Sequence, residues 1–123
     1  MTGFIGIMPV MRVTDLDASI AWYQRSVSAE LCWRAANDGG GENCLLRAGA
    51  VTLMLSTGEH LGSKPSFSGT LYFNTVNVRD LYERIHGQVQ IVWPLEAMSY
   101  GTIEFGIRDP DGYVLAFAER TND

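Results

Sequence analysis

The sequence predicts an α+β fold made of two copies of one βαβββ module. Two observations support this prediction. The order strand, helix and three strands occurs once on each side of a segment at 57–67 that is rich in glycine, serine and proline. The strand-to-helix junctions are also similar, Val13-Thr-Asp-Leu16 in one half and Val78-Arg-Asp-Leu81 in the other. We therefore expect a single domain over residues 1–123, with modules at about 4–56 and 68–119 joined by a linker at 57–67.

The first module begins with a strand and an amphipathic helix. Residues 4–13 are apolar enough for a strand, in which Pro9 indicates a sheet edge or a bend. Thr14 and Asp15 offer an N-cap for the helix that follows. The apolar positions of that helix recur at helical spacing at Leu16, Ile20, Tyr23 and Val27. Three strands are predicted after it, at about 30–36, 44–47 and 51–56.

The second module repeats this order. A strand is predicted at 70–78, and Asp80 with Glu83 three positions later predicts a capping box for a short helix at 81–86. Further strands are predicted at 89–93, 102–108 and 114–119. The sequence Asp109-Pro-Asp-Gly112 predicts a hairpin turn between the last two strands.

Charge and composition exclude several partners. The net charge is −5 and the cationic side chains are scattered singly, which argues against a nucleic-acid surface. No apolar run reaches the length of a membrane span and no basic leader precedes the first strand, so we expect a cytoplasmic protein with no membrane partner. Cys32 and Cys44 form no redox or zinc motif, and we expect them to be small packed thiols.

Three segments together resemble the vicinal oxygen chelate superfamily, which contains glyoxalases, extradiol dioxygenases, fosfomycin resistance enzymes and bleomycin resistance proteins. They are Val13-Thr-Asp-Leu-Asp-Ala-Ser-Ile-Ala-Trp-Tyr23, Val78-Arg-Asp-Leu-Tyr82 and Phe105-Gly-Ile-Arg-Asp-Pro-Asp-Gly112. The resemblance implies that the two modules form a cupped mixed sheet around a cleft, commonly in a homodimer. It does not specify an activity, because this fold hosts many chemistries.

The resemblance also locates the positions that hold a metal ion in other members, which are usually His and Glu on the first and last strands of each module. Counting back seven residues from the expected N-caps Asp15 and Asp80 reaches Met8 and Phe73. The corresponding positions in the last strands are Met54 and Ala116. Because none of these side chains suits a divalent cation, we expect no metal and no cofactor. In this respect the chain is closest to the metal-free bleomycin resistance-like members.

Without a metal, the cleft is predicted to be an apolar pocket for a small molecule. Strand alternation from the four positions above, together with aromatic and acidic residues nearby, gives its expected lining. The predicted ligand-binding residues are Met8, Val10, Met54, Phe73, Thr75, Trp93, Tyr100, Glu104 and Ala116. In the same sheet we expect Ile103, Phe105 and Ile107 to face the helix, which leaves Glu104 on the cleft side.

Three functions follow as hypotheses, the third being a regulatory or interaction module with no ligand, which predicts a closed cleft. The first is a non-catalytic protein that sequesters a hydrophobic or cationic small molecule, an antibiotic being one candidate. Trp33, Trp93 and Tyr100 would offer stacking surfaces, and Glu96 and Glu104 would attract a cation. The alternative is a glyoxalase-like lyase or isomerase whose ligands are not at the usual positions. No nucleophile motif is present, so we predict no catalytic residue.

Overall fold

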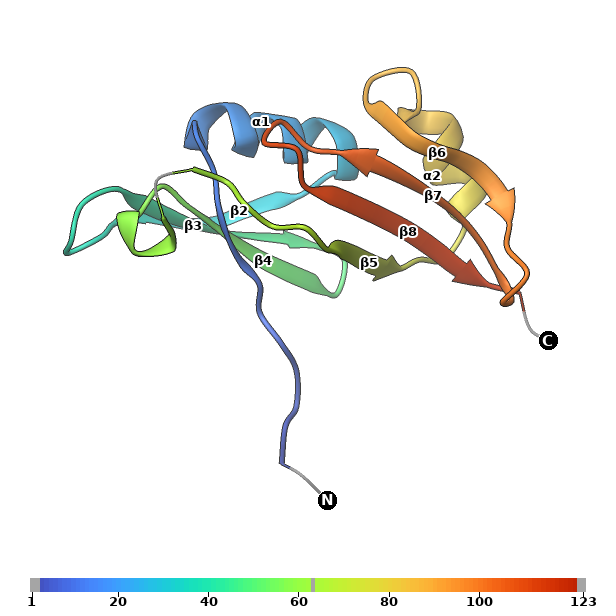
Figure 1. Ribbon diagram of the computed structural model, residues 1–123, viewed down its shortest axis with the longest axis horizontal. Helices are drawn as coiled ribbons and strands as arrows, with labels where there is room; N and C mark the ends of the chain where they lie inside the picture. Colours follow the sequence, from blue (N-terminus) through green and yellow to red (C-terminus); the bar gives the residue numbers. More distant parts are fainter. Residues whose placement is uncertain (1–2, 63, 122–123) are drawn as a thin grey trace. The chain divides into compact units, whose positions relative to one another are not determined.

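The computed structural model describes residues 3–62 and 64–121, which form two compact units. The first unit comprises residues 1–24 and 28–65, and the second comprises residues 25–27 and 66–123. Each unit contains one four-stranded sheet of the same topology (Figure 1). The predicted α+β class with two βαβββ modules is confirmed.

Sheet A in the first unit has the strand order β1-β4-β3-β2. Its strands are β1 (Val10–Arg12), β2 (Glu30–Ala36), β3 (Glu42–Ala48) and β4 (Val51–Ser56). The outer strand β1 runs parallel to β4, and the other pairs are antiparallel. A short 3-10 helix, η1 (Glu59–Leu61), follows the last strand.

Helix α1 (Leu16–Val27) matches the prediction. The Asp15 carboxylate caps its first turn by accepting a hydrogen bond of 3.0 Å from the Ala18 backbone N–H. The helix ends at Ser28, whose backbone is left-handed with φ of 58°. The predicted apolar positions Leu16, Ile20 and Tyr23 are buried.

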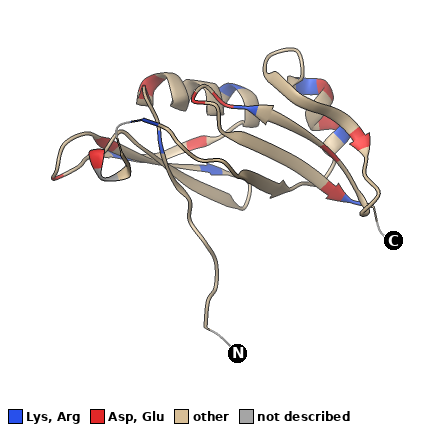
Figure 2. Ribbon diagram, viewed as in Figure 1, with Lys and Arg blue, Asp and Glu red and all other residues tan. Residues whose placement is uncertain are grey.

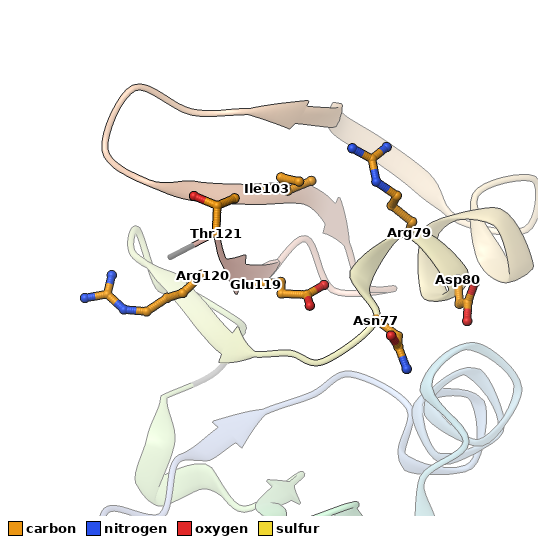
Figure 3. A pocket seen from close by; sticks show the side chains of 7 residues that line it. All are labelled: Asn77, Arg79, Asp80, Ile103, Glu119, Arg120 and Thr121. Carbon is orange, nitrogen blue, oxygen red and sulfur yellow. The ribbon is translucent and has the colours of Figure 1, made fainter. Parts of the chain in front are cut away.

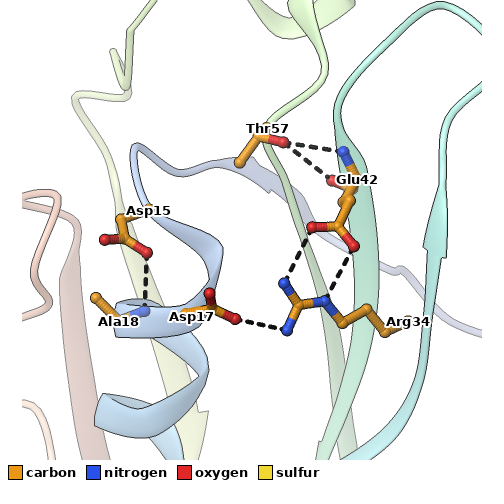
Figure 4. Close-up of polar contacts among 6 residues, drawn as sticks. All are labelled: Asp15, Asp17, Ala18, Arg34, Glu42 and Thr57. Carbon is orange, nitrogen blue, oxygen red and sulfur yellow. Dashed lines mark hydrogen bonds and ion pairs between the residues drawn. The ribbon is translucent and has the colours of Figure 1, made fainter.

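A group of three charged side chains shows which face of sheet A α1 lies on. Arg34 in β2 binds both carboxylate oxygens of Glu42 in β3, at 3.0 and 3.1 Å, and also reaches Asp17 in α1 at 2.7 Å (Figure 4). These hydrogen bonds lower the pKa of Glu42 and raise that of Arg34. Because the group is exposed to solvent, its role is orientation more than stability. The α1 side of sheet A is therefore the side of Arg34 and its cross-strand neighbours Cys44 and Leu55.

Sheet B in the second unit has the order β5-β8-β7-β6, with β5 parallel to β8. Its strands are β5 (Thr70–Asn74), β6 (Gln90–Ala97), β7 (Thr102–Arg108) and β8 (Val114–Arg120). Helix α2 (Val78–Ile85) packs on one face, where its Tyr82 ring meets Phe105 edge-on at a centroid distance of 5.0 Å. The predicted turn at Asp109–Gly112 is confirmed, since Asp109 accepts the Gly112 N–H and Gly112 has φ of 91°.

Several predicted boundaries were wrong. Strand β5 was predicted over 70–78 but ends at Asn74. Helix α2 begins at Val78, three residues before the prediction, and its N-cap is Asn77, so Asp80 and Glu83 do not form a capping box. The reason is a distant residue: Glu119 in β8 accepts the Val78 backbone N–H at 3.0 Å. Strand β1 was predicted over 4–13 but covers only Val10–Arg12. Strand β6 continues through Pro94 to Ala97, which an edge strand tolerates because Pro94 need not donate to a neighbour.

Candidate functional site

Matching hydrogen bonds establish which residues of the two modules are equivalent. The Val13 N–H donates to the Ser56 carbonyl at 2.9 Å, and the Thr75 N–H donates to the Ala118 carbonyl at 2.8 Å. Val13 therefore corresponds to Thr75, and Ser56 to Ala118. The observed N-caps agree with this alignment, since Asp15 and Asn77 each lie two residues farther along the chain.

This equivalence corrects one of the four expected metal positions. Met54 and Ala116 correspond as predicted, but the counterpart of Met8 is Thr70 and not Phe73. Phe73 was counted back from Asp80 as the expected N-cap of α2. The observed N-cap, Asn77, lies three residues earlier, which accounts for the error of three residues. A set of two thioethers, one hydroxyl and one methyl group does not fit a divalent cation, which needs several nitrogen or oxygen ligands. Within residues 3–62 and 64–121, no three His, Cys, Asp or Glu side chains gather as a metal centre.

Phe73 lies on the α2 side of sheet B. Its ring stacks on Phe117 at 5.0 Å, and Phe117 in turn lies 5.2 Å from Phe105, which contacts α2. Side chains alternate along a strand, so Tyr72 and not Phe73 lies on the opposite face. Thr75 lies just beyond β5, where its hydroxyl donates to the Phe73 carbonyl at 2.7 Å.

The face of sheet B opposite α2 collects aromatic side chains around a buried carboxyl group. We call it the aromatic face. Cross-strand register places Tyr72 beside Ala116, and Ala116 beside Gly106. Glu104 shares this face because it is two residues from Gly106 in β7. The aromatic face comprises Tyr72, Trp93, Tyr100, Glu104, Gly106 and Ala116.

Glu104 is the polar centre of the aromatic face. It is 1% exposed and accepts hydrogen bonds from the Tyr72 hydroxyl at 3.0 Å and the Thr102 hydroxyl at 2.8 Å. Tyr72 also shares a hydrogen bond with Tyr100. That bond, then the burial of the phenol, then Glu104 raise the pKa of Tyr72 above its ordinary value. Tyr72 and Tyr100 nevertheless remain 52% and 60% exposed, so a ligand can reach both rings.

Trp93 forms the flat part of the aromatic face. Its six-membered ring lies over Gly106, so closely that a Cβ atom at Gly106 would stand 2.6 Å from the nearest ring carbon. Its indole nitrogen is buried and, among the described residues, has no hydrogen-bond partner. An unmet buried donor of this kind is costly and marks a place where a polar partner would be stabilising.

The charges on this side of sheet B are mixed. Glu96 lies opposite Glu104 in the β6–β7 ladder, which brings two carboxyl groups together near the middle of the face. Arg120 and Arg108 lie near its two ends, opposite Thr102 and Val114. Figure 2 shows that most of the length of the strands of sheet B carries no charged residue. The middle of the aromatic face is therefore suited to an apolar or cationic group.

The predicted ligand-binding residues are divided between the units. Trp93, Tyr100, Glu104 and Ala116 belong to the aromatic face of the second unit. Met8, Val10 and Met54 belong to the first unit, where Val10 and Met54 are directly paired on the face of sheet A away from α1. Tyr72 and Gly106 were not predicted. If Thr70 had been taken as the counterpart of Met8, strand alternation would have placed Tyr72 on the same face as Thr70 and predicted it as a site residue.

A separate hollow of about 540 Å³ lies beside the start of α2 (Figure 3). None of the predicted ligand-binding residues lines it. Its arginines, Arg79 and Arg120, point away from each other, and Glu119 already caps the helix. The hollow thus presents no converging set of functional groups.

These features define a class of protein, in which one chain contains two βαβββ modules of the same sheet topology. Residues 7–117 match the family model of the Glyoxalase/Bleomycin resistance protein/Dioxygenase superfamily. The chain belongs to this superfamily. A search of curated proteins found no match.

Solved structures support the same fold. Similar chains include TioX from Micromonospora sp. ML1, with 21% identity over 94% of this chain and 99% of that one and a TM-score of 0.71. A glyoxylase/bleomycin resistance protein/dioxygenase domain from Frankia sp. EAN1pec has 17% identity over 98% and 93%, with a TM-score of 0.78. Glyoxalase I from Zea mays has 23% identity and a TM-score of 0.77, and 94% of this chain matches 44% of that one. At these identities the likeness extends to the fold alone. None of the described helices is both long and apolar enough to cross a membrane.

Proposed function

We propose that this protein binds a small hydrophobic or cationic molecule on the aromatic face of sheet B without using a metal ion. The observation that carries the proposal is the buried carboxyl group of Glu104, held by Tyr72 beside the flat ring of Trp93. Aromatic rings offer stacking surfaces, and a nearby carboxylate favours a positive charge on the ligand. A planar cationic antibiotic has this chemistry.

The metal positions support binding over metal-assisted catalysis. Met8, Met54, Thr70 and Ala116 supply one neutral hydroxyl oxygen between them, which is not the set of nitrogen or oxygen ligands that a divalent cation needs. The side chains of the aromatic face suit noncovalent contacts with a ligand.

Calorimetric titration with bleomycin, ethidium and neutral indole tests the proposal. We expect at least one of these probes to bind, and Trp93→Ala to weaken that binding roughly five- to tenfold, as the loss of a stacking contact would. Trp33→Ala is the matched control, because Trp33 pairs with Leu45 in sheet A as Trp93 pairs with Gly106 in sheet B. If no probe binds, or if both variants weaken binding equally, the proposed site is wrong.

A second candidate is a metal-free lyase or isomerase of glyoxalase type. It is favoured by the hydroxyl and carboxyl groups of Tyr72 and Glu104, which could act as acid and base. Against it, Glu104 is almost completely buried. A hemithioacetal turnover assay on protein of known metal content decides between the two: turnover that Glu104→Gln abolishes would support the enzyme, and absence of turnover supports binding.

A further inference from the structure

The two hydroxyl groups that contact Glu104 both give their hydrogen atoms to it. Tyr72 donates to one carboxylate oxygen at 3.0 Å, and Thr102 donates to the other at 2.8 Å. A carboxylate can only accept hydrogen bonds, whereas a hydroxyl group has one hydrogen atom and two lone pairs. Glu104 therefore fixes the direction of both hydrogen bonds, and neither hydroxyl group keeps a hydrogen atom for a ligand.

Tyr72 is the member of this pair that presents the buried charge to a ligand. It is 52% exposed, whereas Glu104 is 1% exposed. The phenol keeps its hydrogen atom at neutral pH, because the charge of Glu104 contributes to the raised pKa of Tyr72. Donation to a charged acceptor also polarises the phenol oxygen and makes it a stronger acceptor in turn. The Tyr72 hydroxyl group thus offers lone pairs to a ligand and no hydrogen atom.

The other polar groups around Tyr72 do not reverse this polarity. Glu96, which lies opposite Glu104, can only accept when it is ionised. Asn74 follows Tyr72 on the same side of β5, and its amide group both donates and accepts. The Tyr100 hydroxyl group is engaged by Tyr72. The arginines lie near the two ends of the aromatic face. The middle of the face consequently favours a ligand group that donates hydrogen bonds.

We propose that the ligand carries its positive charge on a nitrogen with at least one N–H, and that this N–H donates to the Tyr72 hydroxyl oxygen. Because it rests on the proposed function, this ligand class refines that function: a protonated amine, an amidine or a guanidine attached to a flat apolar group. The flat group stacks on Trp93. A quaternary ammonium group has the same charge but no hydrogen atom to donate. A carboxylate or carbonyl group would meet the lone pairs of Tyr72 and the charges of the two glutamates.

Calorimetric titration of the full chain with three compounds that share an indole ring tests this ligand class. Tryptamine carries an ammonium group, N,N,N-trimethyltryptammonium carries the same charge without an N–H on the charged nitrogen, and indole-3-acetate carries a carboxylate. We expect tryptamine to bind roughly tenfold more tightly than the trimethylated compound, as one hydrogen bond from a charged donor would give, and indole-3-acetate to bind most weakly. Equal binding of the two cations would overturn this ligand class and leave the proposed function standing. Failure of all three compounds to bind would overturn both.

Substitutions then test whether Tyr72 is the acceptor. Tyr72→Phe keeps the ring but removes the oxygen, so the preference for tryptamine should fall to about twofold or less while binding of the trimethylated compound stays unchanged. Glu104→Gln is a second variant: two hydroxyl hydrogens then compete for one amide oxygen, and the preference should narrow as well.

Two matched controls accompany these variants. Tyr100→Phe removes the neighbouring exposed hydroxyl group, and Glu96→Gln removes the same charge as Glu104→Gln does while leaving Tyr72 bound to Glu104. Both controls should keep the roughly tenfold preference for tryptamine. Far-ultraviolet circular dichroism checks that each variant is folded. A preference that survives in Tyr72→Phe, or one that either control abolishes, would overturn the proposal.

Discussion

The hydroxyl group of Tyr72 donates a 3.0 Å hydrogen bond to Glu104, although their strands are not neighbours in sheet B. β8 lies between them, and its side chains at the crossing are Ala116 and Ala118. These small residues leave room for the phenol to reach across β8. The hydrogen bond between Tyr72 and Glu104 therefore depends on the small size of Ala116 and Ala118, although neither side chain has a polar group.

Removing the Tyr72 hydroxyl should destabilise the protein. Tyr72→Phe leaves Glu104 with Thr102 as its remaining hydroxyl donor, and a buried carboxyl that loses a partner costs about 1–3 kcal/mol. Urea unfolding measures the change in free energy. Tyr82→Phe is the control, because Tyr82 packs on Phe105 and His86 through its ring. Equal stability of the Tyr72→Phe variant and the unmodified protein would show that this hydrogen bond contributes nothing.

The raised pKa of Tyr72 predicts a stability that falls at alkaline pH. A raised pKa means that the folded state keeps the phenol proton longer than the unfolded state does. The contribution is therefore complete below the ordinary tyrosine pKa of about 10 and is lost as the pH rises through the higher folded value. Urea unfolding at pH 8 and at pH 11 measures the change, and the stability lost between these two pH values should be smaller in Tyr72→Phe than in the unmodified protein. Equal losses in the two proteins would show that Tyr72 does not contribute to the alkaline change.

Gly106→Ala should displace Trp93. The added Cβ would lie 2.6–2.7 Å from three ring carbons, so the indole must move off the sheet. We expect a loss of about 1–3 kcal/mol and an altered near-ultraviolet circular dichroism spectrum. Gly87→Ala is the matched control, since nothing lies within 4 Å of its Cβ position. The double variant Gly106→Ala with Trp93→Ala should lose less than the sum of the two single changes.

Glu119→Ala should destabilise α2 more than Asp80→Ala does. Glu119 accepts the Val78 N–H at the start of the helix, and loss of such a cap costs roughly 0.5–2 kcal/mol. Asp80 lies in the first turn but is not the cap. Thermal unfolding followed at 222 nm measures both variants. A larger loss for Asp80→Ala would mean that the local sequence, and not β8, starts the helix.

The error at α2 shows where prediction from sequence ended. The first helix was placed correctly because its cap, Asp15, and its apolar stripe are all local. The second helix was misplaced by three residues because its first N–H is bound by Glu119, 41 positions later in the chain. The same error of three residues placed Phe73 among the predicted ligand-binding residues and left out Tyr72.

The sequence by itself determined the doubled βαβββ order, the helix at 16–27 and the turn at Asp109–Gly112. These follow from local periodicity, turn chemistry and residue type. Only the tertiary structure decided that Tyr72 meets Glu104 across β8, that Trp93 lies on Gly106, and that β1 pairs with β4 only from Val10 onward. The physical reason is strand register. A shift of one residue moves every side chain to the other face, and register is set by contacts between distant parts of the chain.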